Sequence, residues 1–426
     1  MTKIKNSLPL QIFIALGLGI AAGFIFIAIG HPEWPTRYIA FIGTIFLNLL
    51  KFIVVPIVLT SIISGIVSLS DIKQVGSIGL KTVIYYMVTT MFAITLGLIF
   101  ANLAKPLYPV LSTSDAVYEA AEKTSFIDTI INIFPSNIID PLLNSTMLQI
   151  ICIAIFIGFA ILCTGEKGEM VLRLNEALYE VFMVIMNGII KMTPVAVFCL
   201  ITPVVAENGP KVLGSLAAVL GTAYLCYLVQ AVVIDAGTVK LLSGISMGTF
   251  LKKSLPSFMF AFSSTSSIAT IPISMECVED MGGRRDVASF TLPLGATINM
   301  NGTAIYQGVC AIFIASCYGI DLTIPQMITI VITATLAAVG TAGTPGAGLI
   351  MLSMVLQSVG LPVEGIALVA GVDRIFDMGR TGLNVLGDLA AAVIVSKRED
   401  DRDAKLGIKG SGFGKNADSD QKEMTD

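Results

Sequence analysis

The chain has 426 residues, of which 55% are hydrophobic and only 13% are charged, and its formal net charge is −4. About a quarter of the residues of an ordinary globular protein are charged, so this chain cannot cover the surface of a soluble fold. Of its 26 basic and 30 acidic side chains, 15 lie in the last 30 residues, from Lys397 to Asp426. The apolar runs before them are continuous rather than alternating, which predicts an all-α polytopic membrane protein and not a barrel.

Several classes of function are excluded by composition. The only histidine, His31, lies in a loop between apolar runs, so His-based catalysis and His-rich metal sites are not expected. The seven cysteines form no CxxC pair, which argues against a disulfide framework and a zinc site. No basic patch indicates nucleic acid, and the glycine-rich run lacks the lysine of a phosphate loop. We expect no organic cofactor.

Six ordinary membrane spans are predicted in the first half of the chain. Leu8–Gly30 is a charge-free run long enough to cross a bilayer core of about 30 Å at 1.5 Å per residue. It lacks a cleavage site for a signal peptide, so we expect it to be retained. The later runs are Tyr38–Ser70, Thr82–Ala104, Pro141–Gly165, Ala177–Ala206 and Val212–Ile234.

Basic residues in the short loops predict the orientation. They gather at the amino terminus and in the second-to-third and fourth-to-fifth connections, as Lys3, Lys5, Lys73, Lys81, Lys167 and Arg173. By the positive-inside rule, the amino terminus is cytoplasmic. The tail 397–426 is polar and without periodicity, so we expect a disordered cytoplasmic end.

The second half contains three apolar segments, none of which can form one uninterrupted helix. They are Ser254–Met275, rich in Ser and Thr, Val287–Ile320, and Leu322–Val363, which runs 42 residues without a charge. Gly and Pro interrupt helices, and non-helical backbone at membrane depth must line a cavity or be buried in protein. We therefore predict two re-entrant hairpins, centred on Ser263–Thr270 and Gly340–Gly348, with a broken helix between them, the arrangement of a transporter binding site. Ordinary small-residue helix packing is the alternative, but it does not require Pro345.

The last apolar segment, Val372–Val395, carries an unusual polar stripe. At about 100° per residue, six of its polar side chains fall within an arc of about 100°. They are Asp373, Asp377, Arg380, Thr381, Asn384 and Asp388, with Arg374 at the edge of the arc. Each intramembrane charge costs at least about 2.5–3.5 kcal/mol on insertion scales, so the stripe must face a ligand, a cavity or its own counter-charges. Structural salt bridges would explain Arg374, but not Asp388, Thr381 or Asn384.

Four motifs together resemble one family. The run Asp373–Thr381, followed by Asn384 and Asp388, resembles the last helix of the glutamate transporter homologues, the dicarboxylate/amino acid:cation symporter family. Asn299-Met300-Asn301-Gly302-Thr303 resembles that family's NMDGT motif. Ser263–Ser267 before Ala269–Pro272 resembles its first hairpin, and Gly340–Gly348 its second.

The resemblance implies eight transmembrane helices plus two re-entrant helical hairpins, a homotrimer, and an elevator-type transporter. Residues 1–70 and 126–206 would be the scaffold, whereas 82–104 and 212–396 would form the transport domain. The implied activity is uptake of glutamate or aspartate with sodium ions across a prokaryotic inner membrane.

The resemblance also implies the substrate contacts. Arg380 would bind the substrate's side-chain carboxylate, and Asp377 its ammonium group. Asn384, Ser266 and Ser267 would hold the α-carboxylate, helped by the backbone of the second hairpin at Gly348. Thr303 and Thr381 would add polar contacts.

Three sodium positions are implied in the same way. Asp388 would ligate one ion, with main-chain oxygens of Gly295, Asn299 and Asn384. Main-chain oxygens of Thr297, Ala338, Val339 and Thr341 would ligate the second. The third would use Tyr86, Thr89, Thr90, Asn299 and Asn301. Oxygen ligands suit a hard cation.

Two departures from the family pattern bear on coupling. Asn301 stands where the motif has Asp, which removes a charge from the third cation position. Thr265 and Met378 stand where the family often has a second arginine, whereas Arg374 lies one turn before Asp377 and is predicted to pair with it. Fewer bound cations or partial proton coupling would follow.

Alternative functions remain open at this point. A proton-coupled glutamate/aspartate or C4-dicarboxylate symporter shares the same motifs. An intramembrane enzyme is a distant alternative, because His31 cannot form a triad. An ion channel would have Asp388 in its selectivity filter, but the arginine on the same stripe would oppose the conduction of cations. The motifs do not distinguish aspartate from glutamate, because the two differ by one methylene group and the shape of the cavity determines which one fits.

Overall fold

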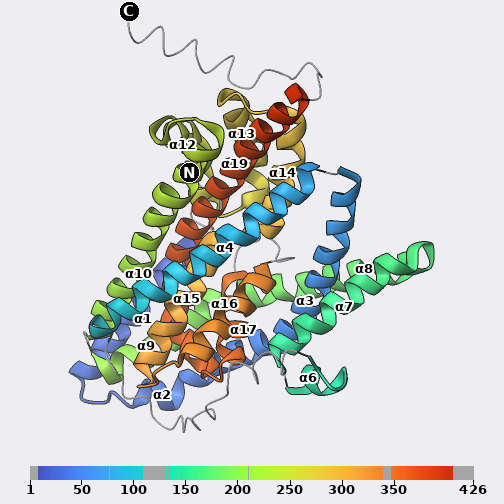
Figure 1. Cartoon of the computed structure of the whole chain (residues 1–426). Helices are drawn as coiled ribbons and strands as arrows, with labels where there is room; N and C mark the ends of the chain where they lie inside the picture. The colour runs from blue at the N-terminus through green and yellow to red at the C-terminus, as the bar shows by residue number, and fades with distance from the viewer. Residues whose placement is uncertain are drawn as a thin grey trace, which may run out of the picture.

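The structure, a computed structural model, describes residues 8–75, 77–108, 131, 134–144, 146–209, 211–338 and 347–405. Every regular element in these ranges is helical (Figure 1). The first half contains α1 (Leu8–Ala28), α2 (Trp34–Tyr38), α3 (Ala40–Val75), α4 (Ser77–Ala104), α6 (Ile139–Asn144), α7 (Met147–Thr164), α8 (Glu169–Lys191), α9 (Thr193–Asn208) and α10 (Lys211–Val229).

The second half is built from shorter, interrupted helices and one long one. It contains a π-helical segment, η3 (Gln230–Asp235), then α11 (Ala236–Ser243), α12 (Met247–Ser264), α13 (Ser267–Asp280), α14 (Arg285–Ile298), α15 (Asn301–Cys317), α16 (Ile324–Ala338), α17 (Ala347–Ser358), α18 (Ile366–Ala370) and α19 (Asp373–Lys405). Single 3₁₀ turns are η1 (Lys105–Leu107), η2 (Gly165–Gly168) and η4 (Val363–Gly365).

Seven of the described helical stretches are long and apolar enough to span a membrane. The predicted spans agree with α1, α3, α4, α7 and α10, but the predicted span Ala177–Ala206 is wrong as a single helix. The chain turns at Met192, between α8 and α9, and Pro194 stands in the first turn of α9. Proline restricts the residue before it and cannot supply a helical N–H, so the turn falls where the new helix begins.

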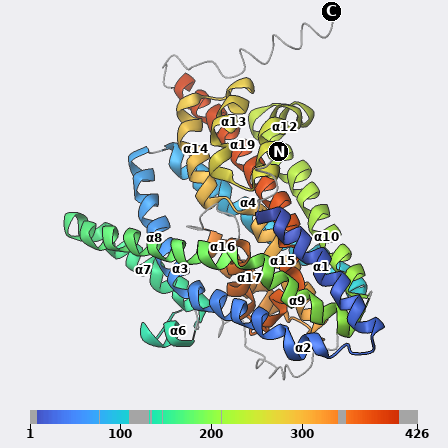
Figure 2. The ribbon, with the colours of Figure 1, turned by 180° about the vertical axis from the view of Figure 1, so that it is seen from behind.

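Helix α19 lies in the middle of the molecule. It packs against α4, α12, α13, α14 and α15, and the part of α19 that could span a membrane is almost wholly buried (Figures 1 and 2). Helices α3, α7 and α8 pack on one another to one side, and α1 packs on α9. The charged face of α19 is therefore enclosed by protein.

Two helix pairs approach α19 from opposite ends. Helices α12 and α13 lie near its carboxyl-terminal end, and α16 and α17 lie near the other end of the molecule (Figures 1 and 2). Helix α12 ends at Thr265, whose φ of 54° is left-handed, and the side chain of Ser266 accepts from the N–H of Ala269 to begin α13. The turn lies inside the predicted first hairpin tip. Most of the predicted second tip, residues 340–346, lies outside the described residues, as does the tail from residue 406.

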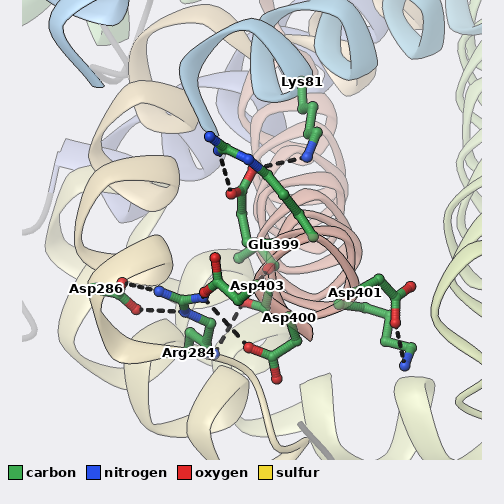
Figure 3. A network of polar contacts seen from close by, with 11 residues as sticks. Lys81, Arg284, Asp286, Glu399, Asp400, Asp401 and Asp403 are labelled. Atoms are coloured by element: carbon green, nitrogen blue, oxygen red, sulfur yellow. Dashed lines mark hydrogen bonds and ion pairs between the residues drawn. The ribbon is translucent and has the colours of Figure 1, made fainter. Parts of the chain in front are cut away.

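An ionic network joins α19 to two other helices at the end opposite the α16–α17 pair (Figure 3). Nζ of Lys81, on α4, lies 2.8 Å from Oε1 of Glu399. Arg284, just before α14, lies 2.7 Å from Asp403, 3.4 Å from Asp400 and 2.6 Å from Asp286. These pairs fix the ends of α4 and α14 against α19.

Candidate functional site

Arg380 is the centre of the polar stripe on α19 and is 3% exposed. Its Nε and Nη2 atoms each lie 3.0 Å from Oδ1 of Asp377, and its Nη1 lies 3.4 Å from Oδ1 of Asp373. A buried arginine needs such counter-charges, since an unpaired charge in a low-dielectric interior is costly. The stripe predicted from sequence therefore exists as a buried set of opposite charges.

The guanidinium of Arg380 is also held from outside α19. Its Cζ atom lies 4.9 Å from the centre of the Tyr306 ring on α15, a cation–π contact. Gly348, in the first turn of α17, lies directly against the guanidinium, so closely that a Cβ atom there would overlap it. Helix α17 thus begins beside the group expected to bind a carboxylate.

The carboxylate of Asp377 has hydrogen bonds or ion pairs with three side chains of α19. In addition to Arg380, it accepts a hydrogen bond of 3.3 Å from the Thr381 hydroxyl. Nη1 of Arg374 lies 3.3 Å from its Oδ2, so the predicted pairing of Arg374 with Asp377 is confirmed. Two arginines and two aspartates, all on one helix, balance one another.

Asn384 ties this charged set to the break between α14 and α15. Its Oδ1 accepts a 2.7 Å hydrogen bond from the N–H of Gly302, and its Nδ2 lies 3.5 Å from Sδ of Met300. Gly302 is required here, because a Cβ would overlap the main chain of Arg380. The backbone of α15 therefore begins in direct contact with α19, and the predicted break around Asn299–Thr303 is confirmed.

Asn299 links the broken segment to Asp388. Its Nδ2 donates to the main-chain oxygen of Asn384 at 2.8 Å and to Oδ1 of Asp388 at 2.9 Å. Gly295 lies against Asp388 and against the Tyr86 hydroxyl, so a side chain at Gly295 would displace both. The four residues implied for the first sodium position therefore lie together: Gly295, Asn299, Asn384 and Asp388.

The residues implied for the third position meet through α4. Oγ1 of Thr90 donates to Oδ1 of Asn301 at 2.9 Å, and the hydroxyl of Tyr86 donates to the main-chain oxygen of Thr291 at 3.0 Å. Thr89 is buried on the same helix but donates to its own helix backbone. Oδ1 of Asn299 and Nδ2 of Asn301 are buried without a hydrogen-bond partner among the described residues.

Oxygen atoms at these positions have the chemistry of a site for a hard cation. Within the described ranges no group of three or more His, Cys, Asp or Glu side chains is placed to hold a metal. The candidate ligands are instead one carboxylate with amide, hydroxyl and main-chain oxygens, and the unpartnered Oδ1 of Asn299 is available to an ion. Sodium fits such a donor set, whereas zinc does not.

Other predicted site residues are not joined to α19 by a described contact. Ser266 lies in the turn between α12 and α13, and Ser267, the first residue of α13, is buried. Thr303 lies beside Met300 on α15, with its hydroxyl 3.6 Å from the sulfur. For the second sodium position, Thr297 is exposed and Ala338 ends α16. Val339 and Thr341 lie outside the described residues.

Sequence reasoning missed two residues that complete the site. Tyr306 lies one turn after Thr303 on α15, so helical spacing from the motif would have found it. Met300 offers its sulfur to both Asn384 and Thr303. A thioether is a weak acceptor, so the motif that contains Met300 does not single out its sulfur as a contact.

Comparison with known proteins identifies chains that are similar to this one over nearly their whole length. A family model described as "Sodium:dicarboxylate symporter family" matches residues 8–398. A protein of Bacillus subtilis named proton/sodium-glutamate symport protein is 37% identical over 94% of each chain. The proton/glutamate-aspartate symporter of Escherichia coli is 35% identical over 96% of each. A C4-dicarboxylate transport protein of Cupriavidus necator is 31% identical, also over 96% of each.

Proposed function

This chain belongs to the sodium:dicarboxylate symporter family and is a transporter rather than an enzyme, and we propose that it takes up glutamate and aspartate together with sodium ions. The coarser statement, a symporter of glutamate or dicarboxylates, follows from the family and from relatives named for those substrates.

The observation that carries the proposal is the buried pair of Arg380 and Asp377 beside Asn384. An acidic amino acid has two carboxylates and one ammonium group. Arg380 supplies a planar, permanently charged fork for one carboxylate, and Asp377 an anion for the ammonium. Without ligand these two groups neutralise each other, so an acidic amino acid replaces one ion pair by two and leaves its α-carboxylate to neutral hydrogen-bond donors such as the Asn384 amide.

The first proposed sodium position lies beside Asn384, on the same helix as this pair. Asp388, Asn299, Asn384 and Gly295 lie together next to the break between α14 and α15. Main-chain oxygens freed by a broken helix are suitable ligands for sodium, and Asp388 offsets the ion's charge. Because Asn384 contacts both the broken segment and the charged stripe, ion binding and substrate binding would share a residue.

We propose the transport architecture from the same arrangement. Eight transmembrane helices and two re-entrant hairpins, α12–α13 and α16–α17, would carry the site in an elevator movement within a homotrimer. Residues 82–104 and 212–396 would move against a scaffold of 1–70 and 126–206. Support comes from α12, α14, α15 and α4 all packing on α19, whereas α3, α7 and α8 pack on one another to one side. The protein is multi-pass, and we propose a bacterial inner membrane with both termini cytoplasmic.

Uptake into proteoliposomes tests the proposal. Purified protein is reconstituted, and labelled glutamate and aspartate are offered under an inward sodium gradient, an inward proton gradient, both or neither. Concentrative uptake that requires sodium supports the proposal. Uptake driven by a proton gradient alone and indifferent to sodium would contradict the sodium part, and absence of any uptake would contradict the activity.

A proton-coupled C4-dicarboxylate symporter is the second candidate. It is favoured by relatives named C4-dicarboxylate transport proteins, at 29–31% identity. Succinate and malate lack the ammonium group that Asp377 would bind, so the two candidates differ in one measurable respect. Competition by succinate against labelled aspartate, at equal concentrations, separates them.

A further inference from the structure

Asp235 is a buried carboxylate that the proposed substrate and sodium positions do not use. It is the last residue of the π-helical segment η3, where α10 continues into α11, and it is wholly buried. Neither of its carboxylate oxygens has a hydrogen-bond partner among the described residues. No lysine or arginine in the described ranges forms an ion pair with it. π-helical turns are rare and occur frequently at functional sites.

The two hydroxyls of the cluster, on Thr238 and Tyr85, do not donate to the carboxylate of Asp235. Oγ1 of Thr238 donates its only proton to the main-chain oxygen of Asp235 at 3.0 Å. The Tyr85 hydroxyl lies 2.9 Å from the same Oγ1, so it must donate its own proton to Thr238. Both hydroxyls are therefore acceptors toward anything else in this cluster.

Gln230, at the other end of the π-helical segment, is the remaining polar side chain of the cluster. It is wholly buried, and both its amide oxygen and its amide nitrogen lack a hydrogen-bond partner among the described residues. It begins the six-residue π-helical segment that Asp235 ends, so the two side chains lie about one helical turn apart. Among the described residues, the cluster thus has one carboxylate, one unpartnered amide, two hydroxyls and no positive charge.

Two other helices bring ionisable side chains toward Asp235. Helices α4 and α19 both pack against η3, and Tyr85 of α4 reaches it through Thr238. Ala236, next to Asp235, lies in the same buried cluster as Leu389, next to Asp388 of α19. The flanking helices α10 and α11 provide no ion pair to it among the described residues. Asp388 is the carboxylate proposed to bind sodium, and two like charges in a low-dielectric interior disfavour each other.

We propose that Asp235 is a proton-binding carboxylate, in a buried site with Gln230, Tyr85 and Thr238, that is separate from the sodium position at Asp388 and linked to it. The proton binds to one carboxylate oxygen and comes from water on whichever side the site is open. It makes Asp235 neutral while Asp388 is ionised. Sodium at Asp388 offsets that charge and so favours loss of the proton from Asp235, and by reciprocity the loss of the proton favours sodium. This inference rests on the proposed function and identifies where protons enter it.

Isothermal titration calorimetry of the purified full-length protein with sodium chloride, without substrate, tests the proposal. Titrations in two buffers of different ionisation enthalpy give the number of protons released per sodium bound, with choline chloride as the control salt. We expect the unchanged protein to release protons and Asp235→Asn to release several-fold fewer. We also expect the sodium affinity of the unchanged protein to rise with pH, and that of Asp235→Asn to depend on pH less.

Asp388 also exchanges a proton for sodium in principle, so the comparison between the two proteins carries the result. Equal proton release and equal pH dependence in the unchanged protein and Asp235→Asn overturn the proposal. If the asparagine variant does not fold, Asp235→Glu keeps the carboxylate and must release protons as the unchanged protein does, whereas Asp235→Leu, a neutral side chain of similar size, must release several-fold fewer. If sodium drives glutamate uptake but Asp235→Asn releases as many protons as the unchanged protein, only the role proposed for Asp235 is refuted. Absence of glutamate uptake by the unchanged protein removes the proposed function itself.

Discussion

Thr90 on α4 donates a 2.9 Å hydrogen bond to the amide oxygen of Asn301 in the first turn of α15. That oxygen is the only atom of the Asn301 side chain that can ligate a cation, and the amide nitrogen has no partner among the described residues. An aspartate in the same place would offer two charged oxygens. This hydrogen bond therefore engages the one ligating oxygen of Asn301, at the position where the family motif has an aspartate.

Asn301→Asp should make substrate binding depend more steeply on sodium. A neutral amide oxygen can ligate sodium, but it cannot offset the ion's charge in a buried site. The measurement is the slope of log affinity for aspartate against log sodium concentration, in both proteins and at two pH values. Identical slopes would mean that the third position tolerates asparagine and that the departure has no bearing on coupling.

Arg380→Ala should abolish the binding of acidic amino acids. Removal of one partner of a buried charge pair costs about 3–5 kcal/mol, which corresponds to an affinity lowered roughly 100-fold or more. Uptake of a neutral amino acid such as serine is expected to survive or appear. Arg374→Ala is the matched control, because Arg374 also pairs with Asp377 but is not enclosed by Tyr306 and Gly348. An Arg380→Ala protein that binds aspartate and glutamate undiminished would refute this role.

Asp377→Asn should weaken the preference for amino acids over dicarboxylates. The amide keeps the shape of the side chain but removes the anion that faces an ammonium group. In the unchanged protein, succinate and malate should compete poorly with labelled aspartate, and in the variant the difference should narrow. Thr381→Val removes a hydrogen bond to the same carboxylate while leaving its charge, and serves as the control. Equal competition by succinate in the unchanged protein would count against the assignment.

Gly295→Ala should lower sodium affinity. The added Cβ would overlap Oδ1 of Asp388 and lie 2.5 Å from the Tyr86 hydroxyl, so the carboxylate must move. Overpacking of this kind typically costs about 1–3 kcal/mol. Gly221→Ala, on α10, is the control, because its Cβ would enter open space. Sodium dependence of aspartate binding is measured for both variants, and an unaltered Gly295→Ala protein would show that Asp388 is not held at the ion position.

Glu399→Gln should lower the thermal stability of the purified protein. Glu399 is 4% exposed and pairs with Lys81 on α4 and Arg402 on its own helix. The change leaves Lys81 without its counter-charge at a helix interface, at a cost of about 1–3 kcal/mol. The control is Glu169→Gln, which breaks an exposed i,i+4 pair with Arg173 worth only about 0.3–0.5 kcal/mol. Equal unfolding temperatures for the two variants would contradict the distinction.

The polar part of the site could be predicted from the sequence because it is periodic. Six side chains on one face of α19, and an asparagine motif that no apolar helix requires, give a signal against a uniformly apolar background. The pairing of Arg374 with Asp377 followed from i,i+3 spacing alone. Such local relations depend on the geometry of a single helix, which the sequence contains.

Relations between helices could not be predicted in the same way. Tyr306 approaches Arg380 from α15, and Gly348 approaches it from α17, through packing that no local pattern records. The break between α8 and α9 falls inside the predicted span Ala177–Ala206, because one proline among apolar residues does not by itself indicate the end of a membrane helix. Asp235 was missed since the predicted span stops at Ile234, and a lone carboxylate there reads as the end of a span.

Lys81 and Glu399 are 318 residues apart in the chain, and their contact has a consequence for biosynthesis. Helix α19 leaves the ribosome after every other described helix, yet it is the one on which α4, α12, α14 and α15 pack. Until then Asn299 lacks its two hydrogen-bond acceptors, which are both on α19, and Arg284 lacks Asp400 and Asp403. These two side chains of earlier helices therefore lack their α19 partners until the last helix is made. The packing of α4, α12, α14 and α15 is therefore completed only when α19, the last helix, is in place.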